Sequence, residues 1–262
     1  MDIEVQGKKI PAIGFGTWAL RGKDCTESVA DALKIGYRHI DTAHTYGNEE
    51  EVGEGIRQSG VKRKDIFLVT KIPPNRLEPD DIVDTANESL AKLGFSYVDM
   101  LLIHWPSPGM KLEAALKVLL DLQSEGKTRM IGVSNFSKVL AEQALSIGPI
   151  VCNQVELNPY NYDQTKENIN FANDNDMMIT AYTPLAKGKV SRDPILQKIG
   201  ERYQKKPAQV ALRWLLQLGN VAVIPKASTR EHRIDNLNIL DFELKYEEIQ
   251  EIKSITGVHS VF

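Results

Sequence analysis

The sequence has only two cysteines, Cys25 and Cys152, in 262 residues, and it has no excess of basic residues, since its formal net charge is −3. The two thiols lie far apart and outside any metal-ligand spacing, so we expect packing roles in a reducing compartment. The five histidines show no metal-ligand spacing either. The charge balance gives no reason to expect nucleic acid or an anionic membrane as a partner. With no signal peptide and no long apolar stretch, the default location is the cytoplasm.

Short apolar runs, bounded by turn residues, recur along the chain and alternate with amphipathic stretches of helical length. This alternation is typical of buried parallel strands in βα units. Two further runs flank Gly7 and predict a β-hairpin. Eight βα units predict an α/β fold, the TIM (β/α)8 barrel with an N-terminal β-hairpin cap, as a single domain over residues 1–262. The expected strands are Ala12–Gly16, Arg38–Asp41, Ile66–Lys71, Val98–His104, Met130–Ser134, Val151–Glu156, Met178–Tyr182 and Val221–Pro225, and Leu244–Thr256 reads as a last helix.

Four polar residues, Asp41, Tyr46, Lys71 and His104, follow or end successive apolar runs. TIM-barrel chemistry lies at the carboxyl ends of the strands, so these side chains are expected at one mouth of the barrel. A carboxylate, a phenol, an ammonium and an imidazole together could transfer protons. Each alone has a simpler interpretation, such as a cap, a packed loop residue, a solvated charge or a core histidine. Their occurrence in successive βα loops favours the functional interpretation.

The segment GFGTWA, from Gly14 to Ala19, matches the loose glycine fingerprint of dinucleotide-binding folds. That fingerprint requires a helix to begin within the motif, whereas the helical pattern here begins near Asp24. We therefore reject a Rossmann domain and expect the glycines to allow close approach of the backbone.

Over nearly its whole length the chain resembles the aldo-keto reductase superfamily, and within it the prokaryotic branch that includes the 2,5-diketo-D-gluconate reductases. The motifs that carry the resemblance are GFGTW from Gly14, GYRHIDTAHTYGNEEEVG from Gly36, TK ending at Lys71, LLIHWP around His104, GVSNF from Gly132, NQVELNPY from Asn153, AYTPLA from Ala181 and IPKAS from Ile224.

The resemblance implies reduction of aldehydes and ketones by hydride transfer from NADPH. Tyr46 would supply the proton, Lys71 would lower the pKa of the phenol, Asp41 would hold Lys71, and His104 would orient the carbonyl oxygen. Small aldehydes, dicarbonyls such as methylglyoxal, or keto-sugars are the expected substrates, and no metal is needed. We also expect a monomer.

The resemblance also implies the binding residues. The substrate pocket would be walled by Trp18, Tyr46 and Trp105, with His104 at the reacting carbonyl, whereas Trp214 is expected in the core. The nicotinamide would stack on Tyr182, and Gly16 and Thr17 would also contact the cofactor. The remaining cofactor contacts would come from Ser134, Asn135, Gln154, Thr183, Pro184, Leu185, Lys226, Ala227, Ser228, His232 and Asn236.

The chain departs from the family pattern at two positions near the cofactor's 2′-phosphate. Ala227 stands where the family has serine, and His232 stands where it has arginine. Arg233 would point about 100° away on a helix, although Arg230 or Arg233 reaching the phosphate stays open. These changes weaken the site, so we expect a modest preference for NADPH with NADH also usable.

The end of the sequence, SITGVHSVF, lacks the long loop that covers the pocket in narrowly specific members, so an open pocket is expected. That feature disfavours a hydroxysteroid-type oxidoreductase. The segment from Tyr182 to Asp193 is short, which predicts a small clasp over the cofactor. An alternative of another class is a nicotinamide-binding sensor or regulatory barrel with vestigial activity. The complete set of four polar residues argues against it, since binding alone would not require Lys71 and Asp41 beside Tyr46.

Overall fold

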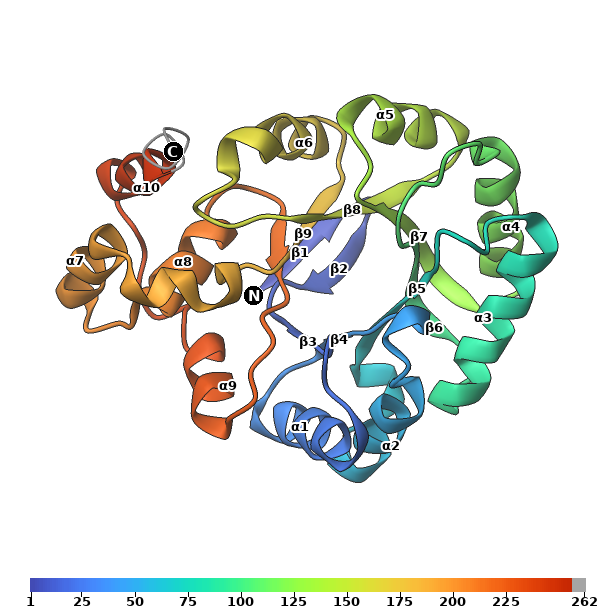
Figure 1. The fold of residues 1–262 in the computed structure, drawn as a ribbon, viewed down its shortest axis with the longest axis horizontal. Coiled ribbons are helices and arrows are strands. Elements are labelled where there is room, and N and C mark those ends of the chain that lie inside the picture. Colours follow the sequence, from blue (N-terminus) through green and yellow to red (C-terminus); the bar gives the residue numbers. More distant parts are fainter. Residues whose placement is uncertain (256–262) are drawn as a thin grey trace.

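Eight parallel strands form a barrel in the computed structural model, which describes residues 1–255. Neighbouring strands pair in the order β10-β9-β8-β7-β6-β5-β4-β3, and a parallel bridge between Ile13 and Val223 closes the ring. The predicted TIM barrel is confirmed (Figure 1). The strands are β3 (Gly14–Gly16), β4 (His39–Asp41), β5 (Phe67–Ile72), β6 (Val98–Ile103), β7 (Thr128–Ser134), β8 (Ile150–Glu156), β9 (Met178–Tyr182) and β10 (Val221–Val223).

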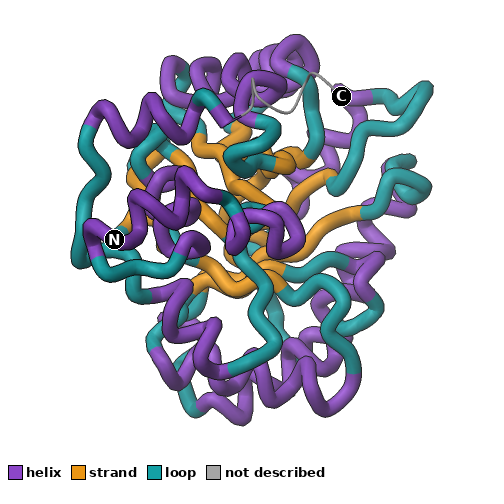
Figure 2. Tube along the Cα trace, turned by 60° about the vertical axis from the view of Figure 1, so that its left-hand side comes forward, coloured by secondary structure: helices purple, strands orange, loops and turns teal. Residues whose placement is uncertain are grey.

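Helices surround the strands on the outside, as the tube view shows (Figure 2). Glycines end three of them in conformations that other residues rarely adopt: φ is 123° at Gly36 after α1, 74° at Gly60 after α2 and 73° at Gly94 after α3. None of the helices within residues 1–255 is long and apolar enough to cross a membrane. The helices are α1 (Gly22–Ile35), α2 (Glu49–Ser59), α3 (Pro79–Leu93), α4 (Leu112–Ser124), α5 (Lys138–Ile147), α6 (Tyr162–Asp174), α7 (Pro194–Tyr203), α8 (Pro207–Leu216), α9 (Arg230–Leu237) and α10 (Tyr246–Lys253).

The expected hairpin is present as β1 (Asp2–Val5) and β2 (Lys8–Pro11), which pair antiparallel. Its turn contacts the starts of two barrel strands. The Gln6 backbone N–H donates to the Asp176 carboxylate at 2.8 Å, and its side-chain amide donates to the carbonyl of Ile150 at 3.1 Å. The hairpin therefore covers the amino end of the barrel and leaves the carboxyl ends of the strands free for a site.

Two expected boundaries differ from the structure in ways that affect the site. Lys71, expected as the last residue of its strand, lies one residue inside β5, and its side chain is fully buried. β10 ends at Val223, before the expected Pro225. The carbonyl of Pro225 instead accepts from the N–H of Gly16 at 3.3 Å. A Cβ at Gly16 would lie 2.6 Å from the Ile224 carbonyl oxygen, so only glycine fits this approach.

The core fills the barrel and the layer between its strands and helices. Trp214 is fully buried on α8, as expected, and its ring packs edge-on against Tyr162 with centroids 5.6 Å apart. Cys25 and Cys152 are both buried free thiols, which confirms their packing role. The last helix, expected over Leu244–Thr256, is α10 and spans Tyr246–Lys253. The end of the sequence from Thr256 lies outside the described residues.

Candidate active site

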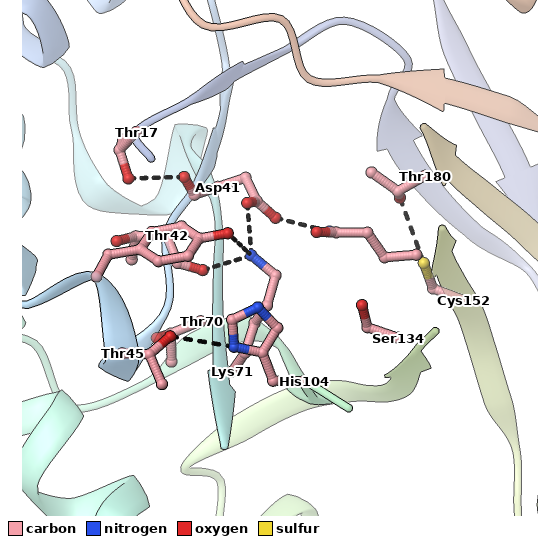
Figure 3. A network of polar contacts seen from close by, with 12 residues as sticks. Thr17, Asp41, Thr42, Thr45, Thr70, Lys71, His104, Ser134, Cys152 and Thr180 are labelled. Atoms are coloured by element: carbon pink, nitrogen blue, oxygen red, sulfur yellow. Dashed lines mark hydrogen bonds and ion pairs between the residues drawn. The ribbon is translucent and has the colours of Figure 1, made fainter. Parts of the chain in front are cut away.

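A buried ion pair joins β4 to β5 at the carboxyl end of the barrel. The Lys71 ammonium donates to Asp41 Oδ1 at 2.6 Å and to the carbonyl of Thr42 at 2.7 Å, and it lies 3.4 Å from the hydroxyl of Tyr46. The Lys71 and Asp41 side chains are only 0% and 2% exposed. Figure 3 shows Asp41, Thr42, Lys71 and His104 converging in this network. The structure thus brings together the four polar residues expected at the barrel mouth.

Asp41 is held by donors on both sides. Its second carboxylate oxygen, Oδ2, accepts from the side-chain amide of Gln154 at 2.8 Å. Its carbonyl accepts from both the hydroxyl and the backbone N–H of Thr17, at 2.9 and 3.0 Å. Of these groups, only Lys71 and Gln154 bind the carboxylate itself, and together they compensate its burial. The Asp41 side chain is therefore held rigidly beneath the site, paired with Lys71.

The pKa of the Lys71 ammonium results from two opposing effects. Burial by itself lowers this pKa. The adjacent Asp41 carboxylate and the Tyr46 hydroxyl raise it by more than burial lowers it, so the net shift of the Lys71 pKa is upward. Lys71 is therefore a cation at neutral pH and points a positive charge at the phenol.

Tyr46 ends a short 3₁₀ helix, η1 (His44–Tyr46), which stops at Gly47 in the left-handed conformation with φ 60°. Burial raises the pKa of the Tyr46 phenol, and Lys71 opposes this rise without cancelling it. Lys71 thus lowers the pKa of Tyr46, as expected, but burial raises it by more, so the net shift is upward. The physical reason is that loss of water around the phenol disfavours the anion more than one ammonium at 3.4 Å stabilises it.

His104 follows β6 and packs edge-on against Tyr46, with ring centroids 5.7 Å apart. Burial and the neighbouring Lys71 cation lower the pKa of His104 to about 4, so the imidazole is neutral at neutral pH. Its Nδ1 lies 3.2 Å from the hydroxyl of Thr45, and acceptance there leaves the ring proton on Nε2. His104 can then donate a hydrogen bond but is a poor reservoir of protons.

Asn48 fixes the loop that carries Tyr46, and sequence reasoning missed it. Its amide donates to the carbonyls of Thr17 and Leu20 at 2.9 and 3.1 Å, and it accepts from the hydroxyl of Thr42 at 2.9 Å. Because this side chain is fully buried, it ties the loop after β4 to the loop after β3. The only sequence signal was an asparagine next to Gly47, which by itself indicates no more than a turn.

A cavity of about 940 Å³ opens above this network. Its volume lies near the upper end of the range of about 300–1,000 Å³ that is usual for ligand pockets. Every residue expected to contact the cofactor or the substrate lines it. Lys71 lies beneath the cavity, behind Asp41 and Tyr46. Trp18 and Trp105 are exposed residues of the wall.

One part of the wall offers an aromatic face with amide and hydroxyl groups. The Tyr182 hydroxyl donates to the side-chain oxygen of Asn135 at 2.9 Å, and the Asn135 amide donates to the carbonyl of His104 and to the hydroxyl of Ser134, each at 3.0 Å. Asn135 takes a left-handed conformation with φ 62°, which asparagine tolerates better than most residues. This arrangement can hold a flat ring with a carboxamide group.

The far part of the wall combines the loop after β10 with the start of α9. Lys226 is exposed there, and its ammonium donates to the hydroxyl of Ser228 at 3.1 Å. His232 also lines this part of the cavity. Arg230 and Arg233 do not line it, because both pair with Asp31 on α1. Of the basic residues weighed for this position, Lys226 and His232 face the cavity.

Several lining residues were not anticipated from the sequence. Lys187, Gly188 and Ser191 come from η3 (Ala186–Arg192), Lys206 is the residue before α8, and Asp235 lies on α9. No motif marks these residues. Only the folded arrangement of the segment after β9 and of the last helices brings them to the cavity.

Comparison with known proteins identifies the family. The aldo/keto reductase family model matches residues 12–256. Methylglyoxal reductase DkgB of Salmonella typhi is 39% identical over 251 residues, which cover 94% of this chain and 93% of that protein. An aldo-keto reductase of Mycolicibacterium smegmatis is 40% identical over 254 residues, which cover 95% and 90% of the two chains.

Solved structures agree with these sequence matches. The crystal structure of a putative 2,5-diketo-D-gluconic acid reductase B superposes with a TM-score of 0.93 and 42% identity, covering 97% of this chain and 92% of the other. A thermostable aldo-keto reductase, Tm1743, gives a TM-score of 0.92 and 36% identity, covering 97% and 98%. The chain therefore belongs to the aldo/keto reductase family and is an NAD(P)H-dependent oxidoreductase.

Proposed function

We propose that this protein uses NADPH to reduce small aldehydes, dicarbonyls or keto-sugars to alcohols, with Tyr46 as the proton donor. NADH is a second, weaker cofactor. The observation that carries the proposal is the contact of Tyr46 with the buried Lys71–Asp41 pair, next to a neutral His104 at the floor of a large cavity. Such a set of groups protonates an oxygen rather than binding a metal ion.

The cavity wall fits a nicotinamide dinucleotide in its chemistry. Tyr182 offers an aromatic face, and Ser134, Asn135 and Gln154 offer hydrogen-bonding groups for a carboxamide. Lys226 offers a cation for a phosphate, with Ser228 beside it. When bound, the reduced nicotinamide supplies the hydride for the carbonyl carbon.

The remaining chemistry is the transfer of one proton to the carbonyl oxygen. Tyr46 carries a proton throughout the neutral range, because its pKa is raised by burial. His104, with a pKa of about 4, donates a hydrogen bond that orients the carbonyl oxygen but keeps its own proton. Proton donation by a placed side chain is worth about 10²- to 10⁴-fold in rate.

Lys71 and Asp41 act after Tyr46 begins to lose its proton. The ammonium at 3.4 Å stabilises the phenolate that forms, and a fixed charge in a buried site costs no reorganisation during the reaction. Asp41 keeps Lys71 charged and in place. Gln154 in turn holds the second oxygen of Asp41. The pair thus lowers the cost of proton transfer while leaving the phenol protonated beforehand.

The choice of small carbonyl substrates rests on the wall and on the relatives. Trp18 and Trp105 are exposed at the cavity mouth and present apolar surface. The similar proteins are named as reductases of methylglyoxal and of 2,5-diketo-D-gluconic acid, which are a dicarbonyl and a keto-sugar acid. The expectation that no C-terminal lid covers the pocket depends on residues 256–262. These residues lie outside the described part of the chain, so this expectation stays a prediction.

The test is to follow the loss of NADPH absorbance with methylglyoxal, a keto-sugar acid and benzaldehyde as separate substrates. Turnover of any of these with transfer of one hydride per product alcohol supports the proposal. Tight NADPH binding without turnover on any carbonyl compound would favour the alternative, a nicotinamide-binding sensor or regulatory barrel. Binding is measured separately by the change in cofactor fluorescence.

A further inference from the structure

Lys206 lines the same cavity as Lys226 and His232, although it comes from the residue before α8. Its ammonium donates to two carboxylates of α9, Glu231 Oε1 at 2.7 Å and Asp235 Oδ2 at 2.8 Å. One lysine thereby joins α8 to α9 across the wall. A cation of the cavity wall is thus held between two anions.

The other basic side chains near this wall differ from Lys206 in their partners. Arg233 donates to Asp31 and to the carbonyls of Ala227 and Ser228, and Arg230 also pairs with Asp31. Within residues 1–255, Lys226 has no carboxylate partner. Of the two lysines that the loop after β10 and the start of α8 contribute to the cavity lining, Lys226 is free of carboxylates in the described part of the chain and Lys206 is shared between Glu231 and Asp235.

The two carboxylates that hold Lys206 differ in exposure. The Glu231 side chain is 73% exposed, whereas that of Asp235 is 23% exposed and lines the cavity. A lysine ammonium has three donors on a flexible stem, so it can keep one carboxylate while it turns another donor to a new anion. Glu231, which is screened by water, is the partner that costs less to give up.

We propose that Lys206 is a second ligand of the cofactor's 2′-phosphate and that Glu231 weakens this contact by competing for the same ammonium. The inference rests on the proposed use of NADPH. It accounts for how this wall recognises a phosphate despite Ala227 and His232, and it makes Glu231 a residue that sets the choice between NADPH and NADH. Asp235 keeps the ammonium at the wall in either case.

The experiment measures binding of 2′,5′-ADP and of 5′-ADP by isothermal titration calorimetry, so that no turnover is required. Lys206→Met should weaken 2′,5′-ADP by about 3- to 10-fold, the size expected for one partly screened charged contact, and should leave 5′-ADP unchanged. Glu231→Gln should tighten 2′,5′-ADP by a similar factor and again leave 5′-ADP unchanged. This gain cannot come from a folding defect.

Lys198→Met is the matched control, since Lys198 is also an exposed lysine paired with a carboxylate, Glu251, but lies on α7 away from the cavity lining. Equal effects on the two nucleotides in Lys206→Met, or an effect no larger than that of Lys198→Met, overturn the inference. Lys226→Met separates the two proposals. A selective loss there without one in Lys206→Met overturns only this inference, whereas wild-type protein that binds both nucleotides equally contradicts the proposed preference for NADPH.

Discussion

Replacing Asp41 with asparagine should remove the negative charge that holds Lys71 and leave a similar shape. The asparagine oxygen can still accept from Lys71, and the amide of Gln154 can rotate to accept from the new NH₂ group. The loss is therefore mainly electrostatic. Removing one partner of a buried ion pair usually costs about 3–5 kcal/mol, and the Lys71 side chain is 0% exposed.

The loss of stability in Asp41→Asn should depend on pH, because Lys71 can lose its proton. In the wild type its pKa is raised by Asp41 and Tyr46 against burial, so the ammonium stays charged when folded. In the Asp41→Asn variant burial dominates, so we expect the pKa of Lys71 in the folded state to fall below its value in the unfolded chain. The variant can then fold with Lys71 neutral, and the cost is that of removing its proton from the unfolded chain. At about 1.36 kcal/mol per pH unit, this cost is at most about 5 kcal/mol at pH ~7 and about 2 kcal/mol at pH ~9.

Urea unfolding of wild type and Asp41→Asn near pH 7 and pH 9 tests this reasoning. The variant should lose about 3–5 kcal/mol near pH 7 and no more than about 2 kcal/mol near pH 9. Asp80→Asn, at an exposed position in the first turn of α3, is the control for a change of charge alone. A loss below about 1 kcal/mol near pH 7, or the same loss at both pH values, would refute the account of the pair.

Two further predictions concern the pH profile and the cofactor. Because His104 has a pKa of about 4, carbonyl reduction should be nearly constant from about pH 5.5 to 8, and an inflection near the ordinary histidine pKa that vanishes in His104→Gln would contradict its neutral state. If His232 faces the phosphate, His232→Arg should tighten NADPH by roughly 5- to 150-fold and change NADH little, while Lys226→Gly should weaken NADPH far more than NADH. Fluorescence titration of both cofactors measures these effects, and unchanged NADPH/NADH ratios in both variants would mean that the phosphate binds elsewhere.

The residues that strands carry were predictable from the sequence. Asp41, Lys71 and His104 lie at or near the ends of apolar runs, and parallel strands bring such ends to one face, so their meeting followed from the pattern. The barrel itself followed from the alternation of short apolar runs with helical stretches. The position of Lys71 one residue inside β5 was beyond the pattern, since a strand's last residues are set by pairing with its neighbours.

Contacts between distant loops and helices were not predictable. Asn48 is important because two carbonyls of another loop converge on its amide, and Lys206 because α9 presents two carboxylates to it. The direction of the Tyr46 pKa shift also depends on the amount of water that the folded chain excludes. Residue types suggest the opposing charges, but only the packed structure decides which effect is larger.

The most direct measurement of the central claim is the turnover of Tyr46→Phe beside its affinity for NADPH. The substitution removes only the hydroxyl that contacts Lys71. We expect kcat to fall by about 10²-fold or more, because the proton donor is lost, while NADPH binding stays close to that of the wild type. Tyr246→Phe, at an exposed tyrosine, is the control and should change neither. More than half of the wild-type kcat in a chemistry-limited assay of Tyr46→Phe would show that Tyr46 does not donate the proton.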